Sequence, residues 1–257
     1  MIPTALSIAG SDPSGGAGIQ ADLKTFHQHK VYGMAVITLL TAQNTRGVRA
    51  VYVMKPLQVI RQLEAVLADI PPQAAKTGAL GDEAIIRAVA RLAGKFRFPV
   101  VADPVMVSKH GAPLLKKNAV RVFIKELLPS VALVTPNLCE AGVLSGIRVH
   151  DPESMEKAAR IIAGFGPRAV LVKGGHLKGE AIDLLYQDGR VRLLKAPRIR
   201  TKHTHGTGCT YSAAITAELA KGSALLPAVM TAKKFITRAI LTAPGLGRGM
   251  GPVNHFA

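Results

Sequence analysis

Residues 205–214, HGTGCTYSAA, join two glycines and a cysteine to a run of small residues. Gly206 and Gly208 allow the backbone to turn its N–H groups inward, and the first turn of a following helix adds unpaired donors and a positive dipole end. Such a turn can bind an anion, with Thr207 between the glycines. Cys209 falls inside or just before that turn, where the same field stabilises a thiolate or any negative charge that develops beside it. A plain tight turn into a closely packed helix fits the pattern too.

A second glycine-rich stretch lies near the start of the chain. Residues 4–9 read as a buried strand, followed by the loop GSDPSGGAG at residues 10–18 and an amphipathic helix through about residue 29. The spacing matches neither the dinucleotide fingerprint nor the Walker loop, so both a ligand site and a bare turn remain open. Asp22 lies one or two turns into the helix, where it reaches back to the loop or faces water.

Polar residues also follow later apolar runs. Gln43 follows the run at 34–41 and offers the paired donor and acceptor that suit a heterocycle edge, and Asp103 ends the run at 100–102. Asn137 and Glu140 fit a capping box or, alternatively, a carboxylate that holds a metal ion beside phosphates. Lys173 is either a phosphate contact or an ordinary lysine at a strand end.

The elements that must position these residues alternate along the chain. Amphipathic helices are expected at 56–69, 82–94 and 225–243, a hairpin turning at Asp188 and Gly189, and an exposed strand at 48–54. Strands that alternate with helices predict an α/β fold with a mostly parallel central sheet and helices on both faces. Ligands of such sheets bind beyond the carboxyl ends of the strands, where the polar residues named above would gather.

Composition narrows the class of protein. The 257 residues are 48% hydrophobic, which is ample for a sizeable core, and no linker or repeat divides them, so a single domain over 1–257 is expected. Two cysteines provide no disulfide framework, which suits a reducing compartment. The first residues lack a basic leader, and no apolar run is long enough to cross a bilayer. A cytoplasmic protein without a membrane partner follows.

The formal charge of +17 predicts attraction to anions without choosing among them. Nucleic acid is disfavoured, because the chain has no Trp, 4% aromatic residues and no long run of Lys or Arg. A basic surface that favours phosphorylated substrates is the simpler interpretation.

Taken together and in order, seven segments resemble the hydroxymethylpyrimidine/phosphomethylpyrimidine kinases of thiamine biosynthesis, which have the ribokinase-like three-layer sandwich. The resemblance runs nearly end to end. It rests on the segments at 9–22, 41–45, 103–106, 135–138, 172–176, 204–210 and 251–255.

The resemblance implies an ATP- and Mg²⁺-dependent kinase that phosphorylates a small pyrimidine alcohol and then its monophosphate. It implies that Gln43 reads the pyrimidine edge, while Gly10, Asp22 and Val105 line the pocket near the hydroxymethyl group. Ala79 stands where a methionine is common in the pocket loop, which leaves the pocket size and the strictness for substrate open.

For the phosphate side, the resemblance implies that Glu140, Asp103 and Asn137 organise magnesium and the nucleotide phosphates, with Lys173 near ATP. Gly206, Thr207 and Gly208 match the anion hole, and Cys209 matches the proposed base. We expect Cys209 to matter chiefly for the first phosphorylation, in which the acceptor is a neutral hydroxyl. Further departures from the family pattern are Cys139, His203, Arg248 and Met250.

Two alternatives remain at this stage. A pyridoxal or pyridoxine kinase would use the same fold for another hydroxymethyl heterocycle, and a non-catalytic regulator would keep the pocket but bind nucleic acid through its basic surface. The glycine turn with Cys209, together with Glu140, argues against the regulator. The exposed strand at 48–54 could pair across a homodimer.

Overall fold

A computed structural model of the chain contains one nine-stranded sheet in the order β3-β2-β1-β4-β5-β6-β7-β8-β9. It describes residues 2–107, 111, 114–115, 117–175, 177 and 179–257. The pairs from β2 through β1 and β4 to β7 are all parallel. The strands are β1 (Thr4–Ser11), β2 (Tyr32–Asn44), β3 (Gly47–Val53), β4 (Ala74–Thr77), β5 (Val100–Ala102), β6 (Leu133–Val134), β7 (Ala169–Val172), β8 (Ala181–Gln187) and β9 (Arg190–Ala196).

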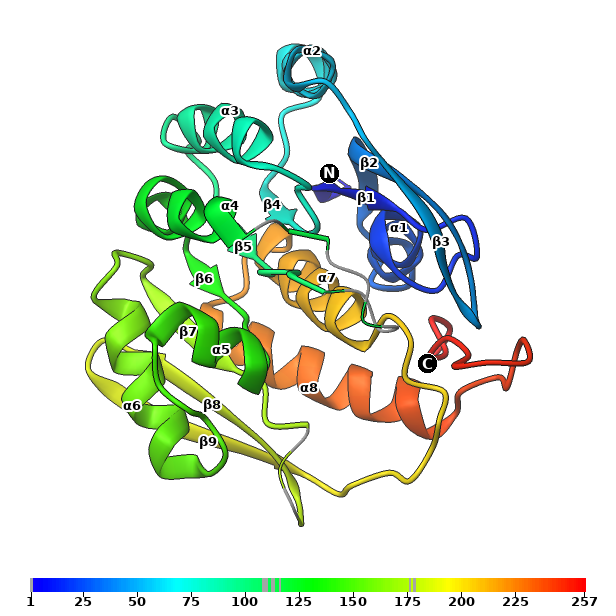
Figure 1. The fold of residues 1–257 in the computed structure, drawn as a ribbon, viewed down its shortest axis with the longest axis vertical. Coiled ribbons are helices and arrows are strands. Elements are labelled where there is room, and N and C mark those ends of the chain that lie inside the picture. Colours follow the sequence, from blue (N-terminus) through cyan, green and yellow to red (C-terminus); the bar gives the residue numbers. More distant parts are fainter. Residues whose placement is uncertain (1, 108–110, 112–113, 116, 176, 178) are drawn as a thin grey trace.

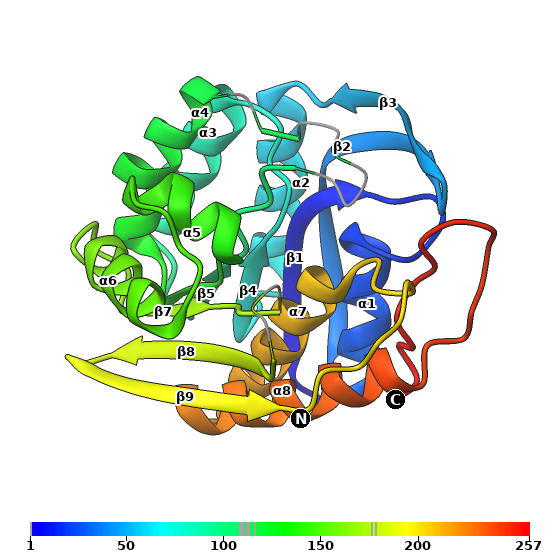
Figure 2. The ribbon, with the colours of Figure 1, turned by 60° about the horizontal axis from the view of Figure 1, so that its bottom comes forward.

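Helices cover both faces of this sheet (Figures 1 and 2). One layer holds α1 (Gly18–Gln28), α7 (Thr207–Ala220) and α8 (Leu225–Leu241). The other layer holds α2 (Pro56–Asp69), α3 (Glu83–Ala93), α4 (Lys117–Val122), α5 (Leu138–Ser145) and α6 (Pro152–Ala163). The predicted three-layer α/β architecture with a mostly parallel sheet is confirmed.

Most side chains of the central strands are apolar on both faces, as a sheet between two helical layers requires, and Ser7 on β1 and Lys76 on β4 are buried exceptions. On β5, Val101 packs with the α7 and α8 core, whereas its neighbours Val100 and Ala102 pack with the core of the opposite layer. All three side chains are buried. Both faces of the central sheet are therefore covered, which leaves the strand ends and the loops beyond them for a site.

The edges follow the predicted pattern as well. β2 and β3 pair antiparallel, and β8 and β9 form the predicted hairpin at the far edge. Its turn residues Asp188 and Gly189 have φ of 50° and 75°, the left-handed values that a tight hairpin turn needs. The segment between β5 and β6 had no helix assigned from the sequence, and in it α4 runs into a π-helical turn at Phe123–Leu127.

Within the part of the chain that the structure describes, no helix is both long enough and apolar enough to span a membrane.

Candidate active site

A cavity of about 750 Å³ crosses the carboxyl ends of the strands and extends around the start of α7. The residues that line the cavity follow the order of the strands in the sheet. Residues from β2, β1 and β4 line one end, the ends of β5, β6 and β7 line the middle, and β8, β9 and α8 line the other end. Every residue that the sequence assigned to substrate, nucleotide, metal or catalysis lies on this cavity, namely Gly10, Asp22, Gln43, Ala79, Asp103, Val105, Asn137, Glu140, Lys173, Gly206, Thr207, Gly208 and Cys209.

The first end of the cavity offers one amide among small and apolar groups. Gln43 is placed by β2 and follows an irregularity in its pairing with β3. Gly10 lies at an irregularity in β1, and a Cβ at this position would overlap the side chain of Leu39. Ala79 and Val105 complete the wall. A single donor–acceptor pair between close walls suits a flat heterocycle of small size.

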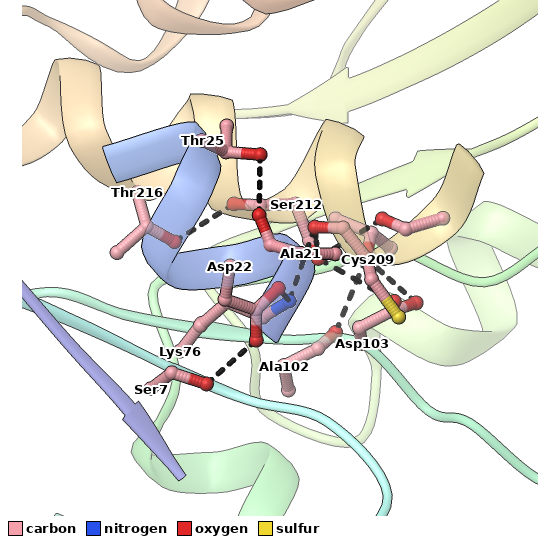
Figure 3. Close-up of polar contacts among 12 residues, drawn as sticks. Ser7, Ala21, Asp22, Thr25, Lys76, Ala102, Asp103, Cys209, Ser212 and Thr216 are labelled. Carbon is pink, nitrogen blue, oxygen red and sulfur yellow. Dashed lines mark hydrogen bonds and ion pairs between the residues drawn. The ribbon is translucent and has the colours of Figure 1, made fainter. Parts of the chain in front are cut away.

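Asp22 does not face bulk water, and it lines the same cavity as the first glycine loop. Its side chain is completely buried in an ion pair with Lys76, with the Lys76 Nζ 2.6 Å from Asp22 Oδ1. Ser7 Oγ donates to the other carboxylate oxygen at 2.6 Å (Figure 3). Sequence reasoning missed Lys76, whose only signal was a charged residue inside the short apolar strand β4. Any contact of Asp22 with a substrate is therefore shared with this pair.

The glycine turn before α7 has the geometry of an anion site. Gly206 is the residue before the helix, with φ of 76°, and a Cβ there would overlap the carbonyl oxygen of Gly16. The N–H of Thr207 donates to the Thr204 carbonyl over a long 3.3 Å. Among the described residues, the N–H groups of Gly208 and Cys209 have no acceptor. Two free donors at a helix start therefore remain for an anion.

Cys209 lies in the first turn of α7, but its thiol is not a stabilised thiolate. Burial raises the pKa of the thiol to about 12, and the charge of Lys76 opposes this rise only in part. The carboxylates of Asp22 and Asp103 raise the pKa further. The expectation of a stabilised thiolate is therefore wrong, because loss of solvent around the sulfur outweighs the field of the helix, whereas stabilisation of a negative charge that develops beside Cys209 stays a prediction.

The middle of the cavity holds a second ammonium–carboxylate pair. Lys173 Nζ lies 2.9 Å from Asp103 Oδ1, and Ser212 Oγ donates to the other oxygen at 3.4 Å. Burial alone would lower the pKa of Lys173, but Asp103 and Glu140 outweigh it and raise the pKa, so the ammonium keeps its charge. A Cβ on Gly208 would lie 3.3 Å from Lys173 Nζ, which places this charge beside the anion turn. The adjoining His176 lies outside the described residues.

Asn137 and Glu140 form the predicted capping box at the start of α5. Asn137 Oδ1 accepts the Glu140 N–H at 3.0 Å, and Glu140 Oε2 accepts the Asn137 N–H at 2.8 Å. Burial raises the pKa of Glu140 to about 7, and the charge of Asp103 adds to this rise while Lys173 opposes it. The capping role does not exclude a second role, because Glu140 also lines the cavity.

These two carboxylates fit a magnesium ion that arrives with a nucleotide. Asp103 and Glu140 offer carboxylate oxygens beside the anion turn, the donor type that magnesium prefers. No cluster of three His, Cys, Asp or Glu suited to a metal occurs among the described residues. Magnesium commonly uses one or two carboxylates together with substrate phosphates, so two suffice here.

A buried pair that the sequence did not reveal joins the two glycine loops. His205 Nε2 lies 2.8 Å from Asp12 Oδ2, and the same carboxylate accepts the N–H groups of Ser14, Gly16 and Ala17. Next to it, the backbone of His205 bonds to Gly251 and Val253 near the end of the chain. The anion turn is thus held from both sides, by the first loop and by the C-terminal segment.

This tie makes stability depend on pH. Burial alone would raise the pKa of Asp12, but hydrogen bonds with His205 and Ser14 outweigh it and lower the pKa to about 2 from the ordinary 3.8. A lowered carboxylate pKa stabilises the fold above pH 3.8, and this stabilisation is lost as the pH falls towards 2. We expect Asp12→Asn to lower the free energy of unfolding by about 2 kcal/mol at pH 7.

Urea unfolding of the parent and of Asp12→Asn at pH 7, 4 and 2.5 checks this expectation. The difference between the two proteins should shrink as the pH falls below 4. A difference that stays constant across the series would contradict the assigned role of the carboxylate.

The far end of the cavity is lined by β8, β9 and α8. Here Lys233 Nζ lies 2.6 Å from Asp183 Oδ2, and Asp183 Oδ1 accepts the N–H of Gly174 at 2.9 Å. The pair thus fixes the backbone directly after Lys173. Apolar groups of Ile199, Ile236 and Ile240 complete this end, where a flat ring can be enclosed.

The fold and the cavity together define a class. A mostly parallel sheet between two helical layers, with an anion turn at the start of a central helix and flanking lysines, is the arrangement of the ribokinase-like phosphotransferases. The family model described as phosphomethylpyrimidine kinase matches residues 12–254. The chain therefore belongs to the phosphomethylpyrimidine kinase family.

Individual relatives agree with this assignment. The hydroxymethylpyrimidine/phosphomethylpyrimidine kinase of Rhizobium meliloti is 50% identical over 260 residues, covering all of this chain and 98% of the relative. The structure of a phosphomethylpyrimidine kinase from Clostridium difficile is 44% identical with a TM-score of 0.83, covering 93% of this chain and 99% of that one. The pyridoxal kinase of Staphylococcus aureus, in complex with AMP-PCP and pyridoxal, is 38% identical with a TM-score of 0.92, covering 100% and 95%.

Proposed function

We propose that the protein transfers a phosphoryl group from ATP to 4-amino-5-hydroxymethyl-2-methylpyrimidine and then to the resulting monophosphate, giving the diphosphate used to make thiamine diphosphate. One observation carries this proposal. The pocket end with Gln43 and the anion turn with Cys209 open into the same cavity as Lys173, in a chain of the phosphomethylpyrimidine kinase family.

The division of the cavity follows from its walls. The pyrimidine lies at the end lined by Gly10, Gln43, Ala79 and Val105, and ATP enters at the end lined by β8, β9 and α8. The two reacting groups then meet at the start of α7, where the N–H groups of Gly208 and Cys209 receive the transferred phosphoryl group. Phosphoryl transfer depends on positioning and on neutralising charge, and both are supplied here by backbone donors and ammonium groups.

Each polar residue in the middle of the cavity has a role in this reaction. Lys173 neutralises negative charge on the phosphates of ATP, and its pairing with Asp103 fixes its position. Asp103 and Glu140 would hold magnesium, which supplies further charge neutralisation when it is bound. Asn137 orients Glu140 through the capping box and lines the cavity beside the phosphates. The thiolate form of Cys209 accepts the proton of the acceptor hydroxyl in the first reaction and returns that proton to solvent afterwards.

A substrate panel tests the proposal. The pyrimidine alcohol, its monophosphate and pyridoxal are each incubated with ATP and magnesium, ADP release is measured, and the products are identified by phosphorus NMR. Consumption of both pyrimidines supports the proposal. Turnover of pyridoxal alone, or of none of the three, refutes it.

Pyridoxal kinase is the second candidate, and one observation favours it. The fold superposes on the Staphylococcus aureus pyridoxal kinase, which binds pyridoxal, with a TM-score of 0.92. Ala79 lines the pocket where a methionine is common in the family, and its smaller side chain would favour a larger ring. A regulator that binds nucleic acid is a weaker candidate, and a gel-shift assay at several salt concentrations run beside the kinase assay separates it.

We further propose a homodimer built on the β2–β3 edge. Leu40 and Tyr52 are opposite each other in the pairing of β2 with β3, and both are exposed apolar side chains next to Val53. Exposed apolar groups on an edge strand are expected to be covered by a partner. Sedimentation velocity should give twice the mass of the chain, and Tyr52→Lys should shift the protein towards the monomer.

The remaining assignments concern the whole chain. One sheet includes strands from residue 4 to residue 196, which supports a single domain over 1–257. Cys139 and Cys209 are both free, as a reducing compartment favours, so we place the enzyme in the cytoplasm. We propose neither a membrane partner nor a nucleic-acid partner.

A further inference from the structure

The acceptor end of the cavity contains a buried charge that the reaction scheme leaves unused. Lys76 extends from β4 towards the layer of α1 and α7, and its side chain is 0% exposed. Its Nζ bonds to Asp22 Oδ1 at 2.6 Å and to the carbonyl oxygen of Cys209 at 3.2 Å. Figure 3 shows the ammonium between the carboxylate on α1 and the first turn of α7. Both members of the pair line the cavity.

The register of the strands explains why a lysine is aimed there. Ser7 on β1 pairs with Lys76 on β4, and both side chains point to the same face as the buried Ala5 and Ala74 two residues earlier. Ser7 and Lys76 thus approach Asp22 from neighbouring strands and satisfy one carboxylate oxygen each. Burial alone would lower the pKa of Lys76, but Asp22 outweighs it and raises the pKa. The ammonium is therefore charged at neutral pH.

The two reactions place different charges at this end of the cavity. The first acceptor is a neutral hydroxyl, whereas the second is a phosphate that carries between about −1.5 and −2 charges at pH 7. A carboxylate beside the acceptor position repels the second acceptor but not the first. An ammonium at the same place has the opposite effect, and it acts strongly because the site is shielded from water.

We propose that Lys76 is a specificity-determining residue that allows the acceptor site to receive the phosphorylated pyrimidine, while Asp22 opposes it. The inference rests on the proposed function and adds the group that selects between its two acceptors. Lys173 does not replace Lys76 in this role, because it pairs with Asp103 after β5 and lies beside Gly208, where the proposed function places the phosphates of ATP.

The test measures a ratio, kcat/KM for the monophosphate divided by kcat/KM for the alcohol. Both acceptors use the same site and the same ATP, so a defect in folding or in ATP binding changes both terms alike. Lys76→Met is expected to lower the ratio by a factor on the order of 10 to 100, as loss of a nearby opposite charge predicts. Asp22→Asn is expected to raise the ratio, because it removes the repulsion between the Asp22 carboxylate and the phosphate of the monophosphate.

A second variant guards against misfolding. Lys76→Met alone leaves a buried carboxylate unpaired, which destabilises a protein strongly, so the double variant Asp22→Asn, Lys76→Met is measured beside it. The double variant should have a ratio below that of Asp22→Asn.

Lys233→Met is the matched control, because Lys233 is also a buried lysine 2.6 Å from an aspartate, but at the far end of the cavity. It should leave the ratio unchanged.

Binding without ATP separates this inference from the proposed function. Calorimetric titration of the parent and of each variant with the alcohol and with the monophosphate gives the same ratio from dissociation constants. Binding of both acceptors without phosphoryl transfer refutes the proposed function and leaves Lys76 testable by the ratio. Two results would overturn the role of Lys76. One is an equal ratio in Asp22→Asn and in the double variant. The other is a shift of the ratio in the same direction for Asp22→Asn and for Lys76→Met.

Discussion

Replacement of Cys209 by alanine is expected to slow phosphorylation of the pyrimidine alcohol about 100- to 1,000-fold and to slow that of the monophosphate less than about tenfold. The alcohol must lose its proton as its oxygen attacks, and a positioned base assists that loss. The monophosphate is already largely ionised at neutral pH, since its second pKa is about 6. Initial rates with the two purified acceptors at saturating ATP check the difference.

The dependence on pH follows from the acidity of the thiol. Burial raises its pKa to about 12, so the thiolate fraction grows tenfold with each pH unit below that value. Turnover of the alcohol should therefore rise with pH between 7 and 9 in the parent and stay flat in Cys209→Ala. The exposed Cys139 supplies the control, because Cys139→Ser should preserve the slope. Equal losses of rate in both reactions for Cys209→Ala would contradict the proposed role of Cys209 as the base.

Replacement of Gly208 by alanine is expected to lower kcat/KM for ATP about 100-fold without lowering the melting temperature. The new methyl group would lie 3.3 Å from the Nζ of Lys173 and 3.5 Å from Asp103 Oδ2. It would fill the space in which the proposed function places the phosphate, yet the backbone at residue 208 needs no left-handed conformation. ATP titrations and thermal melts on the same protein check both parts of the expectation.

Gly206→Ala provides the contrast. Gly206 has φ of 76°, and a Cβ there would overlap the backbone of Gly16. This change should lower the melting temperature together with activity, because the two glycine loops must separate. If Gly208→Ala lost as much stability as Gly206→Ala, the anion turn would be a packing feature and not a phosphate site.

Much of the fold could be predicted from the sequence because its signals are local. Helix α2 begins at Pro56 and ends at Asp69 as predicted, and the turn at Asp188 and Gly189 has the expected left-handed geometry. The residues expected to gather beyond the strands line one cavity, because the carboxyl ends of parallel strands meet at one edge of the sheet.

What could not be predicted depends on pairs of residues far apart in the chain. Asp12 and His205 are separated by 193 positions, and Asp22 and Lys76 by 54, so no periodicity or spacing connects them. The high pKa of Cys209 could not be predicted for a related reason. Its position at a helix start is visible in the sequence, whereas its burial is set by strands and helices from the rest of the chain.

The attachment of the anion turn to the C-terminal segment has a consequence for protein synthesis. The backbone of His205 is held by Gly251 and Val253, and Pro252 forms a bridge with it. A growing polypeptide that has not yet reached residue 253 lacks these restraints, although every strand of the sheet is already complete by residue 196. The restraints on the anion turn should therefore form only after residues 251–253 have been synthesised, later than the last strand of the sheet and later than α7 and α8.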